Sequence, residues 1–152
     1  MNVIGCVLLA GVSLAMVAAG DGPAGKVKVT LVVILASEEG DRIDKRLIAI
    51  ADEVRAKNPK LKSFQLKSME CRSIGKDEKA DFQTVDGKKA VFVLKHCADK
   101  SGKICLAVTA PNQGEIVYES ACGKFLPIIT RYETQNKERL ILAIRVQPCK
   151  PE

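Results

Sequence analysis

The side chains with the widest chemistry in this chain are its cysteines. The 152 residues include six: Cys6 lies in an apolar N-terminal stretch, and the others are Cys71, Cys97, Cys105, Cys122 and Cys149. Thiols form disulfides, bind metals or act as nucleophiles. No Cys-x-x-Cys or His-x₃-His spacing occurs, so the sequence predicts no metal site and no cofactor, and favours disulfides. Cys149 could join the tail to Cys71 or Cys122, and the odd number after Cys6 leaves at least one thiol free or paired with another molecule.

The spacing of Cys97 and Cys105 predicts a cross-strand disulfide. Residues 99–103 read Asp-Lys-Ser-Gly-Lys, and a type I turn with a glycine bulge would pair Asp99 with Lys103. Counting outward then places Cys97 opposite Cys105, at a separation that a disulfide accepts. The alternative is two free thiols packed as small apolar residues, because a register slip of one residue points the sulfurs to opposite faces.

Catalytic chemistry is not indicated by the remaining residues. His96 is the single histidine, and neighbours on a strand face opposite sides, so His96 and Cys97 cannot act as base and nucleophile. There is no Gly-x-Ser-x-Gly, no phosphate-binding loop and no dinucleotide fingerprint. The sequence therefore predicts no catalytic residue, and an enzyme of unrecognised type is kept as an alternative.

The first twenty residues contain no charged side chain. An apolar run over 3–19 followed by small residues is typical of a secretory signal peptide, with cleavage expected after Ala19 or Gly20. No Lys or Arg precedes the run, so an uncleaved N-terminal anchor is the alternative, and membrane contact is expected only through such a leader. Residues 21–26 are a flexible lead-in. A signal peptide predicts a secreted, periplasmic or cell-envelope location, where disulfides persist.

The rest of the chain suits one domain over 27–147 with a short tail, 148–152. The formal net charge is +6, and there are no Trp, two Tyr and four Phe. Acidic residues are interspersed with the basic ones, without the basic stripe that nucleic acid requires, so no nucleic-acid partner is expected. The core must be built from Val, Ile, Leu and Ala.

The hydrophobic pattern predicts an α+β fold with one N-terminal strand, one amphipathic helix and an antiparallel meander of about six to seven strands. Residues 27–36 begin alternating and become continuously apolar, as in a strand that runs into the middle of a fold. The helix is expected from Arg42 to Asn58-Pro59, with Ile43, Leu47, Ile50 and Val54 on one face. The meander strands are expected near 61–72, 80–85, 88–97, 104–109, 115–121, 124–132 and 139–146. Asp86-Gly87 predicts a two-residue hairpin turn, and Pro127 predicts a sheet edge or a bulge.

One hairpin resembles a known inhibitory loop. Gln83-Thr84-Val85-Asp86-Gly87 is similar to the Gln-x-Val-x-Gly loop of cystatin-type cysteine protease inhibitors, which insert it into a protease cleft. The resemblance implies a protease inhibitor that uses Gln83, Val85 and Gly87, and this is the alternative function.

A broader resemblance covers most of the chain after the leader. Segments 33–37, 61–64, 85–87 and 139–144 are similar in order and type to those of small uncharacterised exported bacterial proteins. The resemblance implies an exported α+β domain. We therefore expect a non-catalytic binding or envelope-assembly domain whose partner is another envelope or secreted protein, bound at exposed strand edges and hairpin tips.

Overall fold

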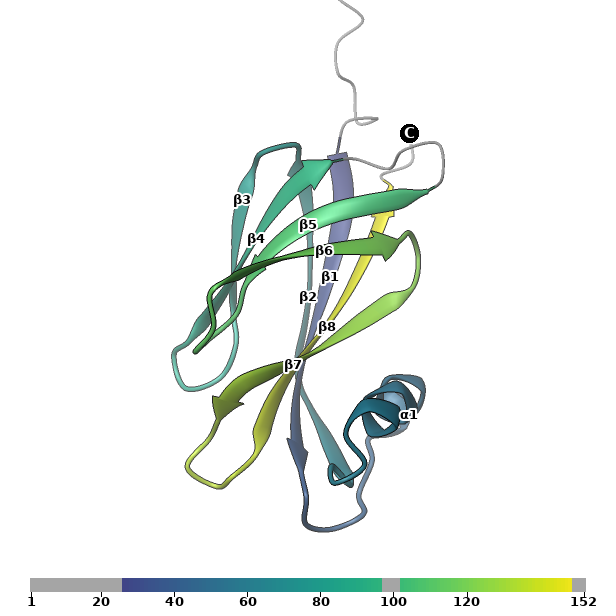
Figure 1. The fold of residues 1–152 in the computed structure, drawn as a ribbon, viewed down its shortest axis with the longest axis vertical. Helices are drawn as coiled ribbons and strands as arrows, with labels where there is room; N and C mark the ends of the chain where they lie inside the picture. Colours follow the sequence, from purple (N-terminus) through teal and green to yellow (C-terminus); the bar gives the residue numbers. More distant parts are fainter. Residues whose placement is uncertain (1–25, 97–101, 149–152) are drawn as a thin grey trace, which may run out of the picture.

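The computed structural model describes residues 26–96 and 102–148. They form a mostly antiparallel β structure with one short α-helix, in agreement with the expected α+β class (Figure 1). The elements are β1 (Lys26–Ser37), the 3-10 helix η2 (Lys45–Leu47), α1 (Ile48–Lys57), β2 (Ser63–Gly75), β3 (Lys79–Gln83), β4 (Lys89–His96), β5 (Lys103–Thr109), β6 (Glu115–Ala121), β7 (Phe125–Glu133) and β8 (Arg139–Pro148).

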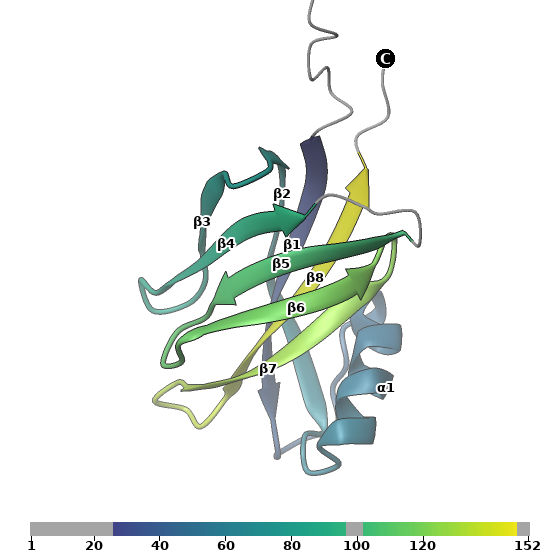
Figure 2. The same cartoon turned by 45° about the horizontal axis from the view of Figure 1, so that its top comes forward.

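The strands form two four-stranded sheets, with the orders β2-β1-β8-β7 and β3-β4-β5-β6. Figures 1 and 2 show the two sheets packed face to face, with α1 on the outer side of the first sheet. The described part of the molecule therefore has three layers and two apolar cores. One core lies between the sheets, and the other lies between the first sheet and α1.

The side chains of β1 contribute to both cores, because they alternate between the two faces of the strand. Alternate side chains of this strand, Val29, Leu31 and Val33 among them, pack between the sheets. Val32 and Ile34, which point the other way, pack under the helix. A strand buried on both faces needs a continuous apolar run rather than alternation, which explains the pattern expected for residues 27–36.

The helix begins later than the sequence predicts. Asp44 accepts a hydrogen bond from the backbone N–H of Arg46 at 3.0 Å and starts the single 3-10 turn η2. The α-helix α1 begins at Ile48 and ends at Lys57, two residues before Pro59. Three residues of the predicted apolar face, Leu47, Ile50 and Val54, are buried in the core beneath the helix. Ile43 lies before the helix and forms an isolated bridge with Phe64.

The predicted meander is wrong in layout. Seven strands follow the helix, but they divide between two sheets, and the last strand, β8, pairs with the first, β1. The reason is the burial of β1 on both faces: such a strand needs a neighbour on each side and a layer on each face. The chain therefore leaves the first sheet after β2, builds the second sheet with β3–β6, and returns through β7 to place β8 beside β1.

The predicted turn at Asp86-Gly87 is confirmed. Asp86 and Gly87 have positive φ angles of 54° and 69°, the combination that matches the twist of a two-residue hairpin. The backbone N–H of Lys88 donates to the carbonyl of Val85 at 2.9 Å and closes the turn. This hairpin joins β3 to β4 at the lower end of the second sheet, on the left in Figure 1.

Candidate functional site

Four strands lie at sheet edges within the described residues: β2 and β7 in the first sheet, β3 and β6 in the second. An edge strand carries backbone N–H and C=O groups that have no partner in the sheet, so it can pair with a strand of another molecule. Pro127 lies in the edge strand β7, which confirms the edge position predicted for this proline.

Three of these edges carry features that hinder strand addition. In β7, Pro127 removes an N–H donor, and the pairing with β8 shifts register between Ile129 and Glu133. The edge β3 has only five residues, and short edges give an added strand little to pair with. In β2, the register with β1 shifts midway along the strand, and charged side chains such as Glu70 and Arg72 are prominent.

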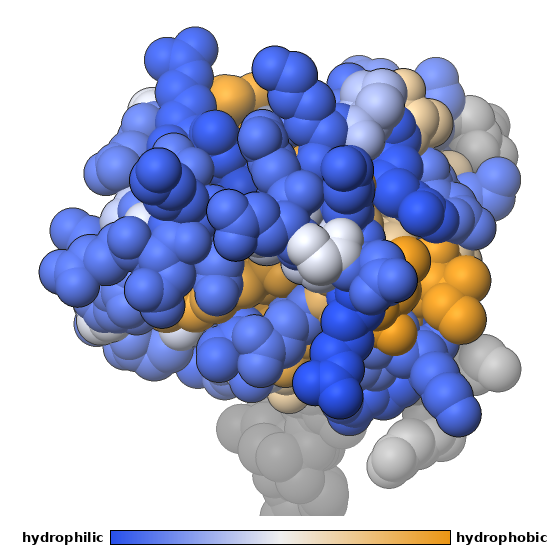
Figure 3. Space-filling view, turned by 90° about the horizontal axis from the view of Figure 1, so that it is seen from below, coloured by the Kyte–Doolittle hydropathy of each residue, from blue (hydrophilic) through white to orange (hydrophobic). Residues whose placement is uncertain are grey.

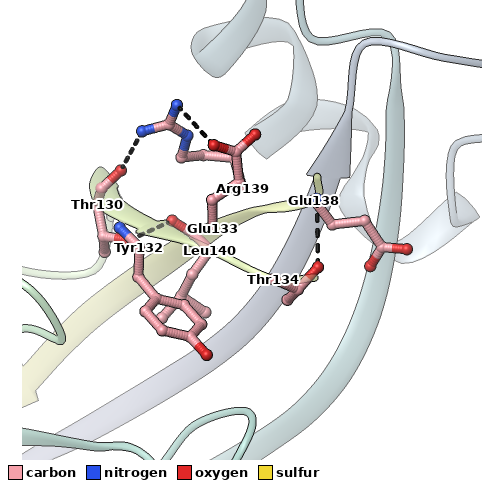
Figure 4. A network of polar contacts seen from close by, with 7 residues as sticks. All are labelled: Thr130, Tyr132, Glu133, Thr134, Glu138, Arg139 and Leu140. Carbon is pink, nitrogen blue, oxygen red and sulfur yellow. Dashed lines mark hydrogen bonds and ion pairs between the residues drawn. The ribbon is translucent and has the colours of Figure 1, made fainter. Parts of the chain in front are cut away.

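Side chains take over the missing ladder bonds at the irregularity in β7 (Figure 4). The hydroxyl of Thr130 donates to the carbonyl of Leu140 at 2.8 Å and accepts from the backbone N–H of Tyr132 at 3.2 Å. Arg139 donates to the carbonyl of Thr130 at 3.2 Å and lies 4.0 Å from the carboxylate of Glu133. These contacts stabilise a bent edge, which fits a flat partner strand poorly.

The fourth edge, β6, is regular and carries two exposed apolar side chains. Its seven residues pair with β5 without a register shift, and they include no proline and no lysine. Ile116 and Val117 are 41% and 55% exposed, and they are two of only four large apolar side chains this exposed in the described residues. The β6 edge thus combines backbone N–H and C=O groups that have no partner in the sheet with apolar side chains that are exposed to solvent.

The end of the molecule that carries the hairpins is polar. A hollow of about 430 Å³ lies between the β3–β4 hairpin, the β7–β8 hairpin and β2, with Leu35 and Val85 among its lining residues. The phenol of Tyr132 donates to the carboxylate of Asp86 at 2.6 Å and joins the two sheets beside it. This hydrogen bond and burial raise the pKa of Tyr132. Figure 3 shows this end as mainly hydrophilic, with hydrophobic residues visible between the hairpins and toward one side.

The residues of the predicted inhibitory loop lie at this end, but they do not stand together at a free tip. Gln83 and Gly87 are exposed, whereas Val85 is only 9% exposed and packs into the core between the sheets. Asp86 is held by Tyr132. A wedge that enters a protease cleft must present its apolar residue to the partner, so the observed geometry does not favour this alternative.

The cysteines form no disulfide within the described residues, where Cys71, Cys105 and Cys122 are free thiols. Cys97 and Cys149 lie outside the described residues, so the predicted tail disulfide involves a residue whose position is not described. Cys71 is exposed on β2, with its sulfur 3.0 Å from the hydroxyl of Thr30. Cys122 is half-buried against the core between the sheets.

The predicted bridge between Cys97 and Cys105 stays a prediction, because Cys97 lies outside the described residues. Cys105 lies opposite His96. A β-bulge lies next to this pair: Leu94 pairs with Leu106, and the next pair is His96 with Cys105, so Lys95 is an extra residue on β4. Nothing in the local sequence pattern signals a bulge at this place.

No cluster of three or more His, Cys, Asp or Glu side chains suited to a metal ion occurs among residues 26–96 and 102–148. None of the helices in that part of the chain has the length and hydropathy needed to cross a membrane. Comparisons with protein-family models, curated proteins and solved structures gave no match for this chain.

Proposed function

We propose that this protein is an exported, non-catalytic binding or envelope-assembly domain that accepts an extended strand of a partner protein at β6. The observation that carries the proposal is the contrast between the edges: β6 has an uninterrupted ladder and exposed Ile116 and Val117, whereas β7 is bent and contains Pro127. A strand added at β6 would form backbone hydrogen bonds and cover these side chains, which is how strand addition generates affinity.

The exported location is proposed from the sequence of the leader and from the resemblance to small exported bacterial proteins. The intact mass of the protein made in an exporting bacterial host tests it. Loss of residues 1–19 or 1–20 is expected. A full-length mass would contradict the signal peptide and favour an N-terminal anchor.

Binding at β6 is tested with a short, uncharged probe peptide, Thr-Ile-Val-Ile-Thr with blocked ends. When the peptide is added to the protein, backbone amides of β6 should exchange more slowly with deuterated water, because the added strand would pair with them. The variant Val117→Lys places a charge opposite the apolar centre of the peptide and should abolish this protection, since a charge covered without a partner loses its hydration.

The matched control is Met69→Lys. Met69 is 57% exposed on β2, the edge of the other sheet, against 55% for Val117. The control should bind the peptide as the unchanged protein does, and both variants should keep the native unfolding midpoint. If β6 gains no protection at millimolar peptide, or if Met69→Lys weakens binding as much as Val117→Lys does, the proposal is wrong.

A further inference from the structure

We infer that the strand bound at β6 carries a basic residue, three apolar residues and a second basic residue in consecutive positions. The inference rests on the proposed function and adds the chemistry of the partner. It follows from the way in which Glu115, Ile116, Val117, Tyr118 and Glu119 alternate between the two faces of the second sheet.

The outer face of β6 carries acid, apolar and acid groups in turn. Ile116 and Tyr118 pair with Val108 and Leu106, which are part of the core between the sheets. The residues between and around them, Glu115, Val117 and Glu119, therefore point to the other face. All three are exposed, and no ion pair involves either glutamate within the described part of the chain. Two unpaired carboxylates flank one exposed valine.

The inner face of β6 is apolar. Tyr118 is half-buried against the core between the sheets, as is Leu126 of the neighbouring strand β7. Figure 1 shows β6 and β7 diverging from the turn that connects them. Residues of an added strand opposite Ile116 and Tyr118 would therefore extend the core between the sheets, and polar groups there would lose water without gaining a partner.

Side chains that are directly opposite on paired strands interact, and opposite charges in such pairs are favourable. The positions opposite Glu115 and Glu119 thus favour Lys or Arg, and those opposite residues 116–118 favour apolar residues. The pattern reads the same in both directions, so it holds for a parallel or an antiparallel partner strand.

A second copy of this chain does not fit the edge. Antiparallel pairing of two β6 strands centred on Val117 would place Glu115 opposite Glu119 twice, and like charges directly opposite are destabilising. Centred on Tyr118, it would place Val117 opposite Glu119. The printed sequence also contains no segment with basic residues at both ends of three apolar ones. The occupant is therefore a different protein.

The test compares three fluorescent peptides with blocked ends on the exported protein: Lys-Ile-Val-Ile-Lys, Glu-Ile-Val-Ile-Glu and the uncharged Thr-Ile-Val-Ile-Thr. Binding is measured by anisotropy at about 0.1 M salt, where charges further apart than about 10 Å are screened. Exposed ion pairs change affinity by about two- to fivefold each. The basic peptide should therefore bind about fivefold or more tightly than the acidic one.

Variants of the two glutamates separate the charge pattern from strand addition itself. In the double variant Glu115→Lys with Glu119→Lys the preference should reverse, and in Glu115→Gln with Glu119→Gln it should disappear while the uncharged peptide binds as before. If all three peptides protect β6 amides with equal affinity, the charge inference is overturned and strand addition stands. If none protects β6, or if the basic peptide binds equally to Val117→Lys, both proposals are overturned.

Discussion

The turn between β6 and β7 joins the accepting edge of the second sheet to the first sheet, and Gly123 lies in this turn. Gly123 has a φ of +84°, and its N–H donates to the carbonyl of Val146 at 2.9 Å. A Cβ at this position would meet no atom within 4 Å. The variant Gly123→Ala therefore suffers from backbone strain alone, with no steric clash.

That strain can be estimated. A left-handed conformation costs a residue with a Cβ about 1–2 kcal/mol, and replacing glycine returns about 0.4–1 kcal/mol by restricting the unfolded chain. The net loss is about 1 kcal/mol, or a fall of about 3–6 °C in the unfolding midpoint for a domain of this size. Urea unfolding followed by circular dichroism measures it.

Gly114 provides the matched control. It precedes β6, its φ is not positive, and a Cβ there would also meet no atom within 4 Å. Gly114→Ala should therefore be neutral or more stable than the unchanged protein, by up to about 1 kcal/mol. Equal stability of the two alanine variants would refute the reasoning, because they differ only in the backbone conformation that the alanine must adopt.

Three further predictions concern the packing and the titrating groups. Phe92 is fully buried between the sheets, so Phe92→Ala should cost about 3–5 kcal/mol in urea unfolding; a loss below 1 kcal/mol would contradict the inter-sheet core. Hydrogen bonds from Arg46 lower the pKa of Asp44 from 3.8 to about 2, so Arg46→Gln should return it toward 3.8 in an NMR titration. Because this pKa is depressed in the folded protein, the associated stability is present above pH 3.8 and is lost as the pH falls toward 2. Asp86→Asn should lower the raised pKa of Tyr132, measured by ultraviolet titration, since the hydrogen bond to the carboxylate is its main cause; an unchanged value would mean that burial dominates.

Local signals predicted the elements well, because each depends on residues close together in sequence. The turn at Asp86-Gly87 needs two residues that tolerate positive φ, and the apolar face of α1 needs only the helical period. The bulge at Lys95 was not predictable in this way. It arises where β4 meets β5, and the sequence of either strand alone gives no sign of it.

The candidate site at β6 could also be predicted only in part from the local sequence. Residues 115–121 were expected to form a strand, and three apolar residues between two glutamates do not follow the alternation of a strand with one buried face. That irregularity is the only local sign of an edge. Whether β6, rather than β7 or β2, has a free and regular edge depends on the order of strands in two sheets, which pairing between distant segments decides.

The sequence by itself determined which segments form strands, where the helix lies, and that residues 27–36 run into the middle of the fold. These properties follow from side-chain periodicity and backbone preference, which act over a few residues. The tertiary structure decided that β8 lies beside β1, that Val85 is buried, that Cys105 is opposite His96, and that β6 is the open edge. Each of these depends on how segments far apart in the sequence pack around two cores, because the burial of one strand determines which other strands remain exposed.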